Sequence, residues 1–277
     1  MANLDKNKTV ENLTIQLKWQ LDIGAEAMVS NSGYDRKKNY TSLKVKEKEV
    51  KESFQTPLFP KIPPKPQKYP DNHINAINVE ESILSSKNLK QLRESLESFE
   101  GSNLKKTATN LVFSDGPPNS KIMFIGEAPG SEEDRLGKPF VGLSGDLFNR
   151  MLKSIELGRD NVYVANIIPW RPPGNRQPTY EEIQSLLPFL IKQIELVNPS
   201  LLVAVGGLAA KTLMNTKGGI LRHRGIWSTF DAGLIRDIPI IATLHPNYLL
   251  KAPSQKKLAW EDLKMIRQKL KQLKQIN

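Results

Sequence analysis

The strongest constraint on this chain is a regular alternation of short apolar segments with longer amphipathic ones. The apolar segments are about the length of a strand and lie at residues 121–125, 162–168, 201–205 and 238–244. Around them, apolar residues recur at helical spacing over residues 80–99, 143–155, 180–197, 208–214 and 260–273. Buried strands that alternate with helices form a parallel sheet covered on both faces. We therefore predict an α/β fold, a three-layer α/β/α sandwich around a four-stranded parallel sheet.

The first 75 residues differ from the rest of the chain. Residues 11–29 carry an amphipathic pattern that predicts a short helix, and residues 30–56 are polar. Residues 57–70 contain six prolines, which fix φ and cannot donate to a helix or sheet, so this stretch is typical of an extended linker. We expect residues 1–75 to be a largely disordered extension and residues 76–277 to form the folded domain.

Charge and composition narrow the class of partner. The chain has 40 Lys and Arg against 29 Asp and Glu, and this net charge of +11 favours a polyanion, with nucleic acid ahead of an anionic membrane. It has no cysteine, which excludes disulfides, thiolate nucleophiles and Cys-ligated zinc or iron–sulfur clusters. No apolar run is long enough to span a membrane, and the polar first residues lack the apolar centre of a secretory signal. We expect a cytoplasmic protein that does not contact membranes.

In sheets of this kind ligands bind beyond the carboxyl ends of the strands, so the residues after each strand are the candidates. The sequence GEAPG follows the first strand, and a carboxylate at Glu127 suits orientation or activation of a water. The second strand leads to Asn166, whose amide can both accept from and donate to the edge of a base. Plainer roles stay open, because Glu127 can cap a helix and Asn166 can tie down its own loop.

The last strand leads into His245, where a neutral imidazole can donate to a developing oxyanion. The apolar residues 248–250 can wedge into a base stack beside a phosphate held by Lys251, or can pack in the core. Residues 171–176 form a rigid loop with two arginines, which suits a phosphate backbone or a merely solvated surface. Phe140 can stack on a base, although a lone Phe is more often a core residue.

Taken together, these motifs resemble the family 4, thermostable-type uracil-DNA glycosylases. The resemblance covers about residues 80–270 and rests on four motifs in the same order: GEAPG with KPFVG, the strand ending at Asn166, RPPGNR and LHPNYLL. The helix at 13–29 and the form WRPPGNR also look like the bacterial, alphaproteobacterial-type branch. The resemblance implies the four-stranded glycosylase fold and removal of a flipped uracil from DNA in base excision repair.

The resemblance also implies a role for each matching residue. Glu127 would activate the hydrolytic water, and His245 would stabilise negative charge on uracil O2 as the glycosidic bond breaks. Phe140 would stack on the uracil, and Asn166 would read its Watson–Crick edge. Apart from the resemblance, thymine differs from uracil only by its C5 methyl, so it must be excluded by shape, and we expect Glu133 or a neighbour to do this. Three residues would shape the backbone of the first loop: Gly126, Ala128 and Gly130. The loop that fills the gap in the duplex would be Asn247, Tyr248, Leu249, Leu250 and Lys251. From its charge alone, we expect the loop at 171–176 to contact DNA through Arg171, Asn175 and Arg176.

Two features depart from the family pattern. These enzymes usually bind a four-iron, four-sulfur cluster through four cysteines, and Ser102, Trp170 and Leu186 stand where three of those cysteines are expected. We therefore expect no iron–sulfur cluster, no other cofactor and no metal, with apolar packing around Trp170 in place of the cluster. The second departure is Asn247, which stands where a small residue is usual.

Two rival functions stay open at this stage. One is a glycosylase for other deaminated bases, such as hypoxanthine or xanthine, and the other is a non-catalytic module that binds damaged DNA. In the extension, Gln55-Thr56-Pro57-Leu58-Phe59 resembles the short peptides that dock on the bacterial sliding clamp. We expect a monomeric bacterial enzyme that acts on uracil-containing DNA.

Overall fold

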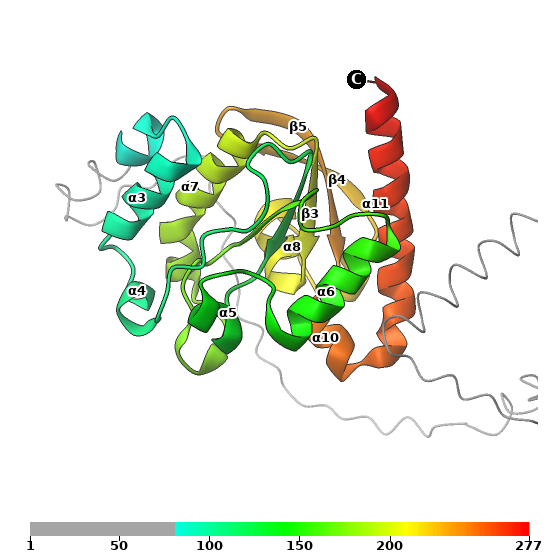
Figure 1. Cartoon of the computed structure of the whole chain (residues 1–277), viewed down its shortest axis with the longest axis horizontal. Coiled ribbons are helices and arrows are strands. Elements are labelled where there is room, and N and C mark those ends of the chain that lie inside the picture. The colour runs from blue at the N-terminus through cyan, green and yellow to red at the C-terminus, as the bar shows by residue number, and fades with distance from the viewer. Residues whose placement is uncertain (1–80, 277) are drawn as a thin grey trace, which may run out of the picture. The chain divides into compact units, whose positions relative to one another are not determined.

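The computed structural model describes residues 81–276, so the predicted helix at 11–29, the linker at 57–70 and the start of the domain lie outside the described residues. The described chain contains one five-stranded sheet in the order β2-β1-β3-β5-β4 (Figure 1). Its strands are β1 (Ile122–Gly126), β2 (Tyr163–Asn166), β3 (Leu201–Val205), β4 (Trp227–Ala232) and β5 (Ile235–Thr243).

Helices cover both faces of this sheet, which makes the three layers that the sequence predicts (Figure 1). The helices on one face are α3 (Leu89–Ser98), α7 (Tyr180–Val197) and α8 (Gly207–Met214). Those on the other face are α6 (Gly142–Ser154), α10 (Pro246–Lys251) and α11 (Lys256–Ile276). Shorter helices connect them: α4 (Leu104–Thr107), α5 (Ser131–Leu136) and α9 (Ile220–His223), with single 3-10 turns at Pro173–Asn175 and Pro253–Gln255. Within the described part of the chain, no helix combines the length and apolar character needed to cross a membrane.

Alternation of side chains along the central strands separates two apolar cores. In β1, Met123 and Ile125 face the α7 side, while Ile122 and Phe124 face the α6 side. Every residue of β1 and β3 is buried, as expected for strands with helices on both faces. The two-residue period of the strand thus builds both interfaces from one apolar segment.

The sheet confirms the four predicted parallel strands and adds a fifth. β1, β2, β3 and β5 are parallel, whereas β4 pairs antiparallel with β5 at the edge of the sheet. The prediction missed β4 because three of its six residues, Ser228, Thr229 and Asp231, are exposed and give no continuous apolar run. β5 also begins at Ile235 rather than at residue 238, because its first residues pair with β4 alone.

The helix predictions agree with the structure except near the start of the described residues. α7 begins at the predicted residue because Thr179 caps it: its hydroxyl accepts from the backbone N–H of Glu182, whose carboxylate accepts from the backbone N–H of Thr179. The single helix predicted at 80–99 is instead two helices. Residues 81–85 are helical, and α3 starts afresh after Asn88, whose side chain caps it.

A buried ion pair ties the C-terminal helix to the sheet. Asp262 on α11 is fully buried, and its carboxylate binds the guanidinium of Arg224, with Nε 3.0 Å from Oδ2. The hydroxyl of Thr243, at the end of β5, donates to the same Oδ2 at 2.8 Å. Burial raises the pKa of Asp262, and the hydrogen bonds from Arg224 and Thr243 oppose that shift.

We predict that Asp262→Ala lowers the free energy of unfolding by about 3–5 kcal/mol, because it leaves a guanidinium buried without its counter-ion. Urea unfolding of the full chain measures the change. The matched control is Glu261→Ala, which removes the adjacent carboxylate that pairs with Lys264 at the surface. The control should lower the free energy of unfolding by less than about 1 kcal/mol. Equal losses of unfolding free energy in the two variants would contradict the role given to Asp262.

Candidate active site

The carboxyl ends of the parallel strands bring the candidate residues to one edge of the sheet. Gly126 ends β1 and lies in register with Asn166, which ends β2. β3 ends beside Gly206, whose backbone N–H donates to the carbonyl of Thr243 at the end of β5. Residues distant in sequence therefore meet where ligands bind in folds of this type.

The Glu127 carboxylate is held by the N-terminus of α8. The backbone N–H of Leu208 donates to its Oε1 at 3.0 Å, so the positive end of a helix dipole faces the negative charge. Gly206 has φ of 101°, and a Cβ there would lie 2.4 Å from the same oxygen. Only glycine fits at this position, because any side chain would displace the carboxylate.

His245 is fixed by the backbone that follows it. It is the N-cap of α10, and its Nδ1 accepts a hydrogen bond from the backbone N–H of Asn247 at 3.2 Å. Because Nδ1 is an acceptor, the proton of a neutral ring resides on Nε2, which is then a donor. Burial lowers the pKa of His245, and the nearby charge of Glu127 opposes the shift. The arrangement favours a neutral imidazole with an N–H available for a ligand.

Glu127 and His245 line the same pocket, which has a volume of about 370 Å³. Its remaining wall comes from α8, the start of α9 and α10, together with residues of the connecting loops. These lining residues are Gln177, Gly206, Gly207, Leu208, Lys211, Ile220, Leu244, Asn247, Tyr248 and Lys251. A carboxylate, a neutral imidazole and two lysines at one pocket suit the binding and hydrolysis of an anionic substrate.

Phe140 and Asn166 meet at Gly126, the residue before Glu127. A Cβ on Gly126 would lie 2.4 Å from Asn166 Oδ1 and 2.7 Å from the Phe140 ring, so glycine is required for this approach. The Phe140 ring stacks on His245 with ring centres 5.5 Å apart and planes inclined by 26°. Phe140 and Asn166 therefore lie next to both catalytic candidates: they pack on Gly126, which precedes Glu127, and the Phe140 ring contacts His245.

The Asn166 amide is buried and incompletely bonded. Asn166 is 5% exposed, and its Nδ2 has no hydrogen-bond partner within the described residues. A buried donor without a partner is costly, so a ligand carbonyl at this point would be favoured. Neither Asn166 nor Phe140 lines the open pocket beside Glu127. A base can therefore reach the amide only if side chains around it move.

Both oxygens of Glu133 bind backbone N–H groups. Oε2 accepts from Gly130 at 2.6 Å, and Oε1 accepts from Phe140. Burial raises the pKa of Glu133, while these two hydrogen bonds and the charge of Arg159 oppose the shift. Through these two hydrogen bonds the carboxylate shapes the loop that carries Phe140.

The structure corrects one residue of the predicted DNA-contact loop on α10. Leu249 is fully buried in the core on the α6 side, so it cannot lie against DNA. Its neighbours Asn247, Tyr248, Leu250 and Lys251 are exposed. On a helix, residues three or four apart share a face, so neighbours in the apolar sequence YLL can face opposite ways, and the sequence does not show by itself which of them faces the core.

The loop at 171–176 is ordered by its own side chains. Arg171 Nε donates to Asn175 Oδ1 at 2.7 Å. Arg176 makes two hydrogen bonds to the carboxylate of Glu182, at 2.8 and 2.5 Å. Because this ion pair already engages Arg176, Arg171 is the arginine of this loop better placed to meet a phosphate.

Sequence reasoning gave no role to several residues that line the pocket, including Gln177, Gly206 and Lys211. The pair Gly206-Gly207 directly follows the third strand, so the rule applied to the other strands would have identified it. Lys211 is one turn further along α8 and has no sequence signal of its own.

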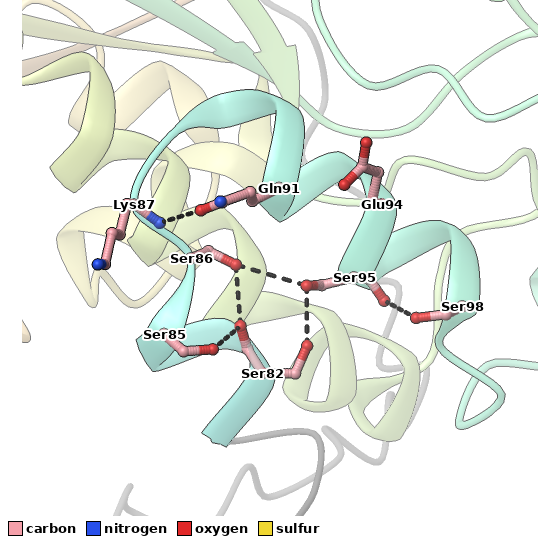
Figure 2. A pocket seen from close by; sticks show the side chains of 8 residues that line it. All are labelled: Ser82, Ser85, Ser86, Lys87, Gln91, Glu94, Ser95 and Ser98. Carbon is pink, nitrogen blue, oxygen red and sulfur yellow. Dashed lines mark hydrogen bonds between the residues drawn. The ribbon is translucent and has the colours of Figure 1, made fainter.

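A second pocket, of about 490 Å³, lies between the helical residues 81–85 and α3 (Figure 2). Its lining is mainly serine, and the hydroxyls bond to one another, as Ser82 does to Ser95 at 2.8 Å. It contains neither Glu127 nor His245. The pocket at the carboxyl edge of the sheet is therefore the candidate active site.

The residues at the expected cluster position do not fit an iron–sulfur cluster. Ser102, Trp170 and Leu186 are all at most 3% exposed, and Trp170 and Leu186 belong to the apolar core on the α7 side. The rings of Phe99 and Phe189 pack in the same core with centres 5.2 Å apart. Indole, leucine and phenylalanine side chains cannot ligate iron, and the chain has no thiolate to replace them.

Comparison with known proteins agrees with this geometry. The model of the Uracil DNA glycosylase superfamily matches residues 113–264. A Type-4 uracil-DNA glycosylase of Sulfurisphaera tokodaii is 36% identical over 188 residues, which are 65% of this chain and 84% of that protein. The Type-4 enzyme of Thermotoga maritima is 38% identical over 158 residues, 56% of this chain and 80% of that protein. That of Archaeoglobus fulgidus is 38% identical over 168 residues, 59% of this chain and 83% of that protein.

The chain therefore belongs to the uracil DNA glycosylase superfamily. This confirms the family that the motifs GEAPG and LHPNYLL indicated.

We predict that the pKa of His245 lies below the value of a free imidazole, and that Glu127→Gln lowers it further by removing the opposing charge. Titration of the ring C–H signals by NMR measures both values, with His245→Gln to assign the signal. Because its pKa is lower in the fold, His245 takes up a proton more readily in the unfolded chain. The free energy of unfolding should therefore decrease as pH falls below about 6.5. A His245 pKa that rises in Glu127→Gln would contradict the charge interaction between the two side chains.

Proposed function

We propose that this protein hydrolyses the N-glycosidic bond of uracil in DNA, releasing uracil and leaving an abasic site for base excision repair. The observation that carries the proposal is the buried Asn166 amide with an unpaired Nδ2, adjacent to a pocket that holds Glu127 and His245. The superfamily match and the Type-4 relatives support the same activity.

Asn166 selects the base by pairing with its edge. Uracil presents an N3–H donor beside an O4 acceptor, which matches the Oδ1 and Nδ2 of one amide. Cytosine presents an acceptor at N3 and a donor at C4, so the same amide orientation opposes it at both positions. Phe140 stacks on the extruded ring, and Gly126 allows the base edge to approach the backbone. The loop that Glu133 organises excludes the C5 methyl of thymine by its shape.

Glu127 and His245 act at opposite ends of the breaking bond. As the bond lengthens, positive charge develops on the sugar and negative charge on the uracil. The Glu127 carboxylate stabilises the sugar cation, orients a water toward C1′ and accepts its proton as the C–O bond forms. The Nε2–H of neutral His245 donates to uracil O2 and stabilises the departing anion. Ala128 and Gly130 complete the loop that presents Glu127.

The exposed surface around the pocket contacts the DNA backbone. Arg171 and Asn175 on one loop and Lys251 at the end of α10 meet phosphates, with Arg176 supporting the first loop through Glu182. Asn247, Tyr248 and Leu250 fill the space that the extruded nucleotide leaves. The protein acts as a monomer in the bacterial cytoplasm, as a branch of its family without cysteine, iron–sulfur cluster or other cofactor.

We expect the full chain to release uracil from a uracil-containing oligonucleotide under single-turnover conditions in the presence of EDTA. It should not release thymine from the matching oligonucleotide. Parallel substrates carry hypoxanthine and xanthine. Activity on hypoxanthine or xanthine but not on uracil would assign the site to another deaminated base. Binding to each oligonucleotide without release of any base would identify a non-catalytic damage binder.

Two variants test the roles within that assay. His245→Ala should lower the rate by about 10²-fold, the effect of losing one oxyanion donor. Glu127→Ala should lower turnover while leaving DNA binding largely intact, because its carboxylate acts on the water and the sugar. Equal rates in the wild type and His245→Ala would contradict the role of the imidazole.

Residues 55–59, which lie outside the described part of the chain, are a candidate binding peptide for a second partner. We predict that Gln55-Thr56-Pro57-Leu58-Phe59 docks on the bacterial sliding clamp, because this peptide carries two adjacent apolar anchors. Replacing Leu58 and Phe59 together with alanine should abolish clamp binding in a pull-down with purified clamp and leave uracil release unchanged. Unchanged clamp binding would contradict the prediction.

A further inference from the structure

We propose that Arg159 is a positioning residue for base recognition: together with Glu133, it fixes the backbone of Phe140 and thereby the aromatic surface on which the extruded base stacks. The inference rests on the proposed function, because it concerns the base pocket of that activity. Arg159 lies on the loop between α6 and β2, and no sequence motif points to it.

Phe140 adopts a backbone conformation that its surroundings must enforce. Its φ is 54°, in the left-handed region that residues other than glycine rarely occupy. Its N–H donates to the Glu133 carboxylate, and its carbonyl oxygen accepts from Nη2 of Arg159. The same oxygen approaches Gly145 so closely that a Cβ there would lie 2.0 Å away. One peptide segment is thus held by an anion on one side and a cation on the other.

Every nitrogen of the Arg159 guanidinium takes part in this arrangement. Nε donates to Asn149 Oδ1 at 2.8 Å, and Nη1 lies 3.3 Å from both Asp115 Oδ2 and the carbonyl oxygen of Pro139. The guanidinium carbon lies 5.1 Å from the centre of the Phe148 ring, which packs on Phe140 with ring centres 4.5 Å apart. A planar fork with fixed donor directions can satisfy these partners together, whereas a lysine ammonium cannot.

The same network reaches the strand that carries Asn166. Asp115, the acidic partner of Arg159, exchanges two backbone hydrogen bonds of 2.9 Å with Val164 on β2. Val164 is two residues before Asn166 on that strand. Arg159 therefore sets the spacing between the stacking ring and the amide that reads the base.

This arrangement limits how Phe140 can move when a base enters the buried site. Asn166 and Phe140 are both buried, so side chains must move to admit uracil. Because both backbone groups of Phe140 are fixed, its ring torsions are the freedom left to that residue. Loss of Arg159 would let the whole segment shift, which weakens base binding, while the hydrogen bonds that hold Glu127 to Leu208 and His245 to Asn247 stay in place.

The test uses Arg159→Lys, which keeps the charge and loses the fork. Inhibition of the full-length enzyme by free uracil should weaken about tenfold, as for loss of a hydrogen bond to a charged group. Affinity for DNA that contains an abasic site should stay within about twofold, because Arg159 contacts no residue assigned to the DNA surface. The matched control is Arg267→Lys, since Arg267 has similar exposure (28% against 24%) and also forms an ion pair, but with Glu156 rather than with a residue around Phe140.

A double-mutant cycle separates positioning from general loss of structure. If Arg159 acts through Phe140, Arg159→Lys should have no further effect on uracil inhibition in a Phe140→Ala background. Additive effects, or an equal loss of abasic-DNA affinity, would overturn the inference. If Arg159→Lys does not fold, Asn149→Ala removes one anchor of the guanidinium and should weaken uracil inhibition about threefold; unchanged inhibition would then overturn it. Failure of the wild type to release uracil would instead contradict the proposed function.

Discussion

The close approach of two strand ends at Gly126 is the constraint on which the site depends. Because this residue has no Cβ, the Asn166 amide and the Phe140 ring can occupy the space above the end of β1. The next residue, Glu127, then turns toward α8, where a second glycine, Gly206, leaves room for its carboxylate. The absence of a Cβ at two glycines thus allows an amide, an aromatic ring and a carboxylate from three separate segments to gather at the end of β1.

Charge keeps this arrangement in place where packing alone would not. The N-terminus of α8 faces the carboxylate of Glu127, while Glu133 and Arg159 hold opposite ends of the Phe140 segment. Each charged group is at least partly buried and has a specific polar partner, so the interactions are directional rather than diffuse. A site built this way keeps its geometry before the substrate arrives, which is what electrostatic stabilisation of a charged transition state requires.

Much of this architecture could be predicted from the sequence, because strand and helix periods are local properties. The strand at 201–205 and the helix at 180–197 have the predicted bounds, and Glu127, Asn166 and His245 could be identified as candidates because each ends or closely follows a strand. β4 could not, since an exposed edge strand lacks an apolar run. The burial of Leu249 and the contacts of Glu133 depend on packing between distant segments, which periodicity does not encode. The contacts of Arg159 with Phe140 could not be predicted for the same reason.

The attachment of α11 to the end of β5 has a consequence for how the protein is made. Asp262 supports Thr243, which lies two residues before His245, yet it is synthesised after every candidate catalytic residue. Glu127 and Asn166 emerge from the ribosome long before the helix that steadies their partner. We expect the nascent polypeptide to acquire a working site only once α11 has been synthesised, so that products terminated before α11 would carry every candidate catalytic residue and little of the activity.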